Sequence, residues 1–115
     1  MKFGDIVTVD LPRPATGSSR EQIGSRPAII FHADAARLNL STLVIVPLTS
    51  SRSGMHFQGS FLVHPSAANG LSDESVVLVH QIRAIDKKRI KEKLGRLAEE
   101  DLEKLRAEIK AILGL

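Results

Sequence analysis

The sequence predicts a mainly β domain that ends in one helix. Three features support this: short runs of β-branched residues, turn-forming residues between those runs, and helical spacing near the C-terminus. With 115 residues, 43% hydrophobic and 25% charged, the chain fits a single globular domain over residues 1–115. Short strands followed by a helix favour a small, strongly bent antiparallel sheet, or a partly open barrel, closed by that helix.

The first two predicted strands flank a long polar segment. Residues 5–11 alternate in part and are rich in β-branched side chains, which predicts a strand. Residues 12–25 contain mostly Pro, Gly, Ser, Arg and Gln, so we expect an exposed, functional loop there. Residues 26–32 form the second predicted strand, and their continuous apolar run indicates burial on both faces. For residues 34–40 we expect a short helical turn.

The centre of the chain predicts at least three further strands. Residues 42–48 give the strongest strand pattern, ended by Pro47, which cannot donate to a sheet ladder. A flexible polar loop is expected over residues 50–54. Residues 57–64 and 76–85 complete at least five strands, with turn residues at 65–70 between them.

The C-terminal segment has the pattern of an amphipathic helix. Acidic residues 99–101 and Lys110 suit the positive and negative ends of a helix dipole, and Gly114 suits a C-cap. The apolar stripe consists of Leu102, Leu105, Ile109 and Ile112.

Composition excludes several classes of protein. The chain has no cysteine, so disulfide frameworks, thiol catalysis and cysteine-ligated metals are excluded. Residues 1–5 do not resemble a signal peptide and no stretch has the length of a membrane helix, so we expect a cytoplasmic protein. The net charge of +3 comes entirely from residues 87–115, with nine basic and six acidic residues. That basic run is either a solvated helix or loop face or a patch that faces a polyanion.

Two polar side chains lie at the ends of neighbouring apolar strands. Arg26 begins the second predicted strand and Thr49 follows the third, so the fold could bring a fixed cation and a hydroxyl to one sheet edge. A guanidinium can bind two phosphate oxygens, and a hydroxyl can donate to a third or hold a neighbouring 2′-hydroxyl. The pair suits chemistry on a phosphodiester.

Several sequence blocks resemble those of one family, in its order and spacing. They are Gly4–Val7, Gly24–Ala28, Val46–Ser50, Val77–Asp86 and Leu94–Leu97. Through them the chain resembles the MazF/PemK toxins along essentially its whole length. The resemblance implies an SH3-like barrel of the CcdB/PemK type. It also implies a homodimer and sequence-specific endoribonuclease activity on single-stranded mRNA, with no metal or other cofactor.

The resemblance also implies an antitoxin and a set of functional residues. The antitoxin's C-terminal tail would lie over the RNA groove, in an assembly of the heterohexamer type. The catalytic pair falls on Arg26 and Thr49, and the RNA-contacting regions fall on loops 12–25 and 50–58 and around Gln81. The expected phosphate and base contacts are Arg13, Arg20, Gln22, Ser50, Arg52, Asn69, Gln81 and Arg83.

The sequence does not identify which groups accept and donate the protons in this reaction. Cleavage without a metal would use the 2′-hydroxyl as nucleophile and leave a cyclic phosphate and a 5′-hydroxyl, yet Arg26 is too basic to accept the proton. Two of the four histidines could act as an acid–base pair, although strand-end positions also suit them as ordinary polar residues. His80 departs from the family, which usually has an acidic residue before the Gln-Ile-Arg triplet.

Two other classes of function are compatible with the predicted barrel. A gyrase inhibitor of the CcdB kind has the same architecture, but it acts through a tail that carries Trp, and this chain has no Trp. A catalytically silent RNA-binding barrel is the second alternative. The scarcity of aromatic residues, 3% of the chain, means that RNA affinity would depend mainly on cations.

Overall fold

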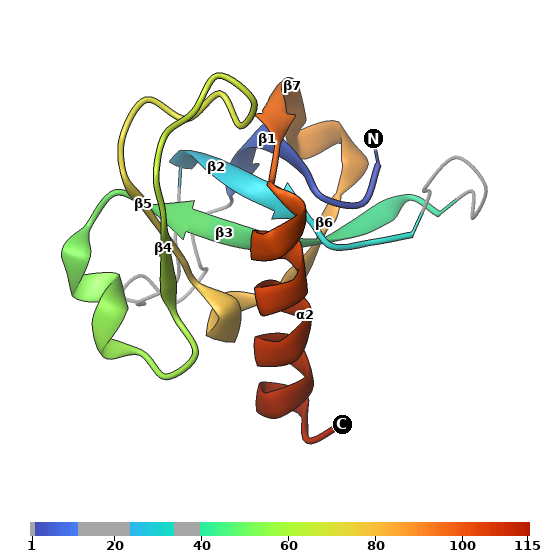
Figure 1. The fold of residues 1–115 in the computed structure, drawn as a ribbon. Helices are drawn as coiled ribbons and strands as arrows, with labels where there is room; N and C mark the ends of the chain where they lie inside the picture. The colour runs from blue at the N-terminus through green and yellow to red at the C-terminus, as the bar shows by residue number, and fades with distance from the viewer. Residues whose placement is uncertain (1, 12–23, 34–39) are drawn as a thin grey trace.

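The computed structural model describes residues 2–11, 24–33 and 40–115 (Figure 1). The strands are β1 (Asp5–Leu11), β2 (Gly24–Ile30), β3 (Thr42–Thr49), β4 (Phe61–Val63), β5 (Ser75–Val77), β6 (Arg83–Asp86) and β7 (Ile90–Arg96). The helical segments are the short 3-10 turns η1 (Arg52–His56), η2 (Val79–Gln81) and η3 (Lys87–Arg89), and the α-helix α2 (Glu99–Leu113).

The described strands form one antiparallel sheet in the order β4-β5-β3-β2-β1-β7, with β6 also paired to β3. Of the described strands, β3 is the longest, and it pairs with β2, β5 and β6. Its first half pairs with β6, from Thr42 opposite Asp86 to Ile45 opposite Arg83, and its end pairs with β5, at Leu48 and Thr49. Figure 1 shows the resulting curved sheet with α2 against it. The predicted bent antiparallel sheet closed by a helix is confirmed.

Both faces of the central strands are buried, as the apolar run of the second predicted strand indicated. Along β2, Ile29 belongs to one core cluster, whereas Ala28 and Ile30 belong to the other. The first cluster lies between the sheet and α2, and the second is formed by β1, β2, β3 and β6. Successive side chains of a strand point to opposite faces, so an uninterrupted apolar run is required here.

Several predicted boundaries are wrong. The predicted strand 57–64 is only β4, because residues 52–56 form η1 and the chain turns again before Phe61. The predicted strand 76–85 is interrupted by η2, which lets β5 and β6 pair with different halves of β3. A continuous apolar run does not reveal such a break. The second strand also begins two residues earlier, at Gly24.

The basic run after residue 86 contains a strand that the sequence did not predict. β7 pairs with β1 at the end of the sheet order, and most of its charged side chains are exposed. Charged residues on an edge strand oppose pairing with other chains, which explains why this strand looks like a solvated segment. Most of the predicted loop 12–25 and of the predicted helical turn 34–40 lies outside the described residues.

The predicted C-terminal helix is confirmed as α2. Leu102, Leu105 and Ile109 are buried, and Gly114 ends the helix with a positive φ of 73°. Ile112 differs from the prediction, with 43% exposure, because the end of α2 projects beyond the sheet (Figure 1). Within the described residues, no helix has both the length and the apolar character needed to cross a membrane.

Candidate functional site

The end of β3 and the following turn η1 carry a cluster of hydroxyl groups. The backbone N–H of Ser51 donates to Thr49 Oγ1 at 3.2 Å, and the hydroxyls of Ser51 and Ser53 are 2.7 Å apart. Thr49 is half-buried, and both serines are exposed. The N–H of Ser51 occupies an acceptor site of the Thr49 oxygen and leaves the hydroxyl hydrogen able to donate.

A glycine allows η1 to approach Thr49 closely. A Cβ on Gly54 would lie 3.0–3.2 Å from side-chain atoms of Leu78, Val76 and Thr49, a distance at which these neighbours would have to shift. The buried Gly54 therefore packs the turn against the ends of β3 and β5. This packing places the hydroxyl cluster beside η2.

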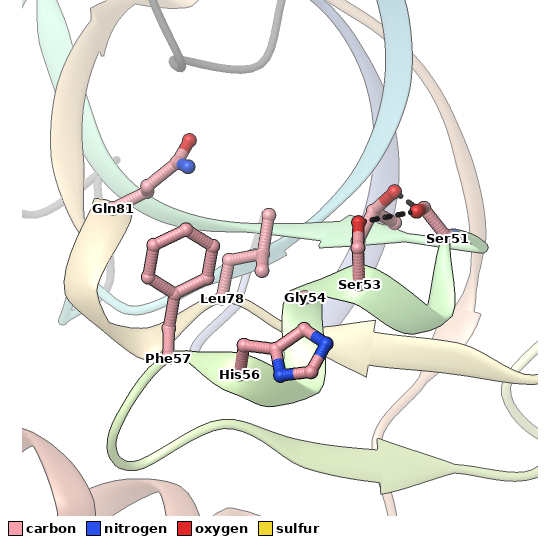
Figure 2. Close-up of a pocket in the computed structure, with 8 residues that line it drawn as sticks. Ser51, Ser53, Gly54, His56, Phe57, Leu78 and Gln81 are labelled. Carbon is pink, nitrogen blue, oxygen red and sulfur yellow. Dashed lines mark hydrogen bonds between the residues drawn. The ribbon is translucent and has the colours of Figure 1, made fainter.

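A cavity of about 490 Å³ joins η1 to η2 at this point. It is lined by Thr49, Ser51, Ser53, Gly54, His56, Phe57, Leu78 and Gln81. Figure 2 shows the Gln81 amide and the Phe57 ring on one side of the cavity and the two serines on the other. The β3–β5 ladder, extended by the hydrogen bond from Leu78 N–H to the Pro47 carbonyl, holds η2 in place. Thr49 and Gln81, predicted from separate blocks, thus share one cavity.

Arg26 lies at the end of β2 that faces the same region. The β2–β3 ladder pairs Ala28 with Pro47, and continuing this register by two residues would set Arg26 opposite Thr49. Pro27 and Ser50, the neighbours of this pair in the sequence, both line a second cavity of about 170 Å³. The Arg26 side chain is exposed.

Arg83 lies farther along the same surface. It is half-buried in β6, and it lines a cavity of about 390 Å³ together with His80, Gln81, Ile82 and Ala84. Gln81 lines both this cavity and that of Thr49, so the two cavities adjoin at Gln81. This position suits the phosphate contact that the sequence predicts for Arg83.

Two other residues predicted to contact RNA, Arg52 and Asn69, bond to other residues of this chain. Arg52 forms an ion pair with Glu74. Asn69 is only 5% exposed, and its Oδ1 accepts from the N–H groups of Ser66 and Leu71. Its Nδ2 donates to the carbonyl of His64 at 2.8 Å. The Asn69 side chain therefore organises a turn, and the base contact predicted for it stays a prediction. Arg13, Arg20 and Gln22 lie outside the described residues.

The histidines do not form a pair at the cavity. His32 Nδ1 accepts from the N–H of Val44, and His64 Nδ1 lies 2.7 Å from a Glu74 oxygen. His56 lines the cavity wall, whereas His80 stacks against Phe57 from the neighbouring turn. Burial lowers the pKa of His80 below its usual value of 6.5. In the part of the chain that the structure describes, no group of three or more His, Asp or Glu side chains could hold a metal ion.

Ser51 and Ser53 lie within the predicted RNA-contacting loop 50–58, but the sequence did not single them out. Both belong to the hydroxyl-rich run after Thr49, which has the composition of an ordinary flexible loop. The density of hydroxyls directly after a strand is the signal that could have identified them.

Comparison with known proteins identifies the family of this chain. The family model of PemK-like, MazF-like toxins of type II toxin–antitoxin systems matches residues 2–113. Endoribonuclease MazF of Staphylococcus saprophyticus is 32% identical over 115 residues, covering 100% of this chain and 92% of the relative.

Solved structures of MazF from Deinococcus radiodurans share the fold. A crystal structure of MazF superposes with a TM-score of 0.78 at 23% identity, covering 100% of this chain and 97% of that one. A MazE–MazF structure from the same organism superposes with a TM-score of 0.71 at 27% identity, covering 100% and 96%. This chain therefore belongs to the PemK/MazF-like toxin family of type II toxin–antitoxin systems.

Proposed function

We propose that this chain is a sequence-specific endoribonuclease that cleaves single-stranded mRNA in the cytoplasm and thereby inhibits growth. The observation that carries the proposal is the Thr49 hydroxyl in a cavity that Gln81 also lines, next to a second cavity lined by Gln81 and Arg83. Continuing the β2–β3 register two residues beyond Ala28 and Pro47 would set Arg26 opposite Thr49. The 32% identity to an endoribonuclease over the full chain supports the same reaction.

In the proposed reaction, the 2′-oxygen of a ribose attacks the adjacent phosphorus and the bond from phosphorus to the 5′-oxygen breaks. The 2′-hydroxyl loses its proton and the leaving 5′-oxygen gains one, which gives a 2′,3′-cyclic phosphate and a 5′-hydroxyl. No metal ion is needed, because the guanidinium of Arg26 neutralises charge on two phosphate oxygens. Thr49 donates its hydroxyl hydrogen to a non-bridging oxygen or orients the 2′-hydroxyl, while the N–H of Ser51 holds its oxygen.

The test is cleavage of a synthetic single-stranded RNA by the purified chain in the presence of EDTA. We expect 5′-hydroxyl and cyclic-phosphate ends, and a loss of about 10²–10³ in rate for Arg26→Ala and for Thr49→Ala. Thr42→Ala is the matched control, because it changes the same residue type at the opposite, exposed end of β3. Equal rates for wild type and both site variants would overturn the assignment. Gyrase-dependent DNA breaks without RNA cleavage would instead identify a gyrase inhibitor.

We also propose that a cognate antitoxin neutralises the chain, with its C-terminal tail over the RNA groove. A homodimer would present two such grooves in an assembly of the heterohexamer type. The Deinococcus radiodurans relative was solved as a MazE–MazF structure, which supports a partner of this kind. Co-purification with the product of the adjacent gene, followed by mass measurement of the complex, tests both statements. Recovery of the toxin alone under co-expression would contradict them.

A further inference from the structure

Phe57 and His80 form an aromatic stack beside the proposed catalytic hydroxyl. Their ring centroids are 4.1 Å apart, and the ring planes are inclined by 22°. The two residues come from separate segments, Phe57 directly after η1 and His80 within η2. Phe57 is 37% exposed, an unusual position for a large apolar ring, and it lines the same cavity as Thr49 (Figure 2). An exposed ring supported from behind can accept a second π-system on its open side.

His80 also contacts the amide of Gln81. The nitrogen Nε2 of Gln81 lies 3.4 Å from Nε2 of His80. With the amide placed this way, Gln81 Nε2 donates and His80 Nε2 accepts, which corresponds to a neutral imidazole with its proton on Nδ1. That Nδ1 is buried and has no hydrogen-bond partner among the described residues. Burial favours the neutral ring by lowering the pKa of His80. The contact decides which end of the Gln81 amide faces His80, and hence which end faces the cavity.

We propose that Phe57 is a stacking platform for one nucleobase of the RNA. We further propose that His80 is a positioning residue that fixes the Phe57 ring and the Gln81 amide, so that Gln81 selects this base. The inference rests on the proposed function and extends it to specificity. Stacking accepts any base, because every base has a π-face, whereas an amide held in one orientation distinguishes the hydrogen-bonding edges of bases. His80 would touch the RNA only through these two neighbours.

The charged groups that share cavities with His80 are Arg83 and Glu108. Arg83 from β6 lines one of these cavities, and Glu108 from α2 lines the other, together with Phe57. The positive charge of Arg83 disfavours a protonated imidazole at His80, and the negative charge of Glu108 favours it. When His80 takes up a proton, both ring nitrogens become donors, and Nε2 can no longer accept from Gln81. We therefore expect the base preference to change as the pH falls through the lowered pKa of His80.

The experiment is cleavage of an RNA pool randomised over the recognition sequence, with the cleaved ends sequenced. We expect Gln81→Ala and His80→Phe to relax the preference at the same single position, with total cleavage within about tenfold of wild type. His80→Phe keeps an aromatic ring behind Phe57 and removes only the hydrogen bond. The double variant should be no less selective than either single one, since both act through one contact. Phe57→Ala should lower cleavage by about tenfold or more, and Phe57→Leu less, because stacking is lost.

His64→Phe is the matched control, because it removes an exposed histidine that pairs with Glu74 and does not line the cavity of Thr49. A second readout is the base preference as the pH is lowered from 8, which should change in wild type as the pH falls through the lowered pKa of His80 and stay constant in His80→Phe. Unchanged preference in His80→Phe, or relaxation at a different position from Gln81→Ala, would overturn this inference. In those cases the Thr49→Ala variant would still be inactive if the proposed function is correct. Failure of the proposed function itself would appear as no Thr49-dependent cleavage at all.

Discussion

The carboxylate of Glu74 pairs with the guanidinium of Arg52 and so connects η1 to the start of β5. The second Glu74 oxygen lies 2.7 Å from Nδ1 of His64; the side chains of Arg52 and His64 are largely exposed, and that of Glu74 is partly buried. Exposed ion pairs add about 0–1 kcal/mol to folding stability. The main effect of this ion pair is therefore to hold the Arg52 side chain in one position. An RNA phosphate would compete with Glu74 for the same guanidinium.

Glu74→Gln should therefore strengthen RNA binding. The substitution releases Arg52 from its carboxylate partner, and we expect a several-fold gain in affinity at low salt with a change in unfolding free energy below about 1 kcal/mol. Fluorescence anisotropy with a non-cleavable RNA measures the affinity. Arg52→Ala combined with Glu74→Gln is the control, and it should show no gain. Weaker binding by Glu74→Gln alone would mean that the ion pair positions Arg52 for RNA.

Asn69→Ala should destabilise the fold without changing base selection. The substitution removes the amide that joins Ser66, Leu71 and His64, and it leaves the buried N–H of Leu71 and two part-buried backbone groups without this partner. We expect a loss of about 1–3 kcal/mol in urea unfolding, whereas Gln81→Ala should cost less than about 0.5 kcal/mol. If Asn69→Ala instead keeps full stability and alters the cleavage sequence, the predicted base contact would be correct after all.

Gly70→Ala should cost much more than Gly24→Ala, although both glycines have positive φ, 69° and 80°. A Cβ on Gly70 would lie 2.0 Å from the carbonyl oxygen of Leu94, whereas at Gly24 no described atom lies within 4 Å. In both variants the alanine has to adopt a left-handed backbone conformation, which costs roughly 1–2 kcal/mol. The backbone of β7 must also move in Gly70→Ala, which we expect to add at least about 2 kcal/mol in the same urea titration. Equal losses would mean that the 66–70 turn adjusts freely.

The sequence could single out Arg26 and Thr49 as a candidate pair because their positions depend on local pattern. Apolar runs mark the central strands, so polar residues at their ends are visible as Arg26 and Thr49. The break within residues 76–85 was not predictable, because Leu78 just before η2 and Val79 within it are as apolar as strand residues would be. Likewise the side chain of Asn69 gives no sign of whether its amide will bind RNA or its own turn. Both outcomes are decided by tertiary contacts that a linear pattern does not contain.

Asp101→Asn should raise stability at neutral pH. Burial raises the pKa of Asp101 above its ordinary 3.8, Glu100 adds to the rise, and Lys104 and His64 oppose it. A carboxyl whose pKa is higher in the folded state opposes folding when ionised, so the wild type loses stability as the pH rises through that pKa. The gain from Asp101→Asn should thus be present at pH 7 and vanish below about pH 4. Thermal unfolding at pH 7 and pH 3.5 measures it, with the exposed Glu103→Gln as the control on the same helix. A loss of stability at pH 7 would show that the attraction of the helix N-terminus for this carboxylate outweighs its burial.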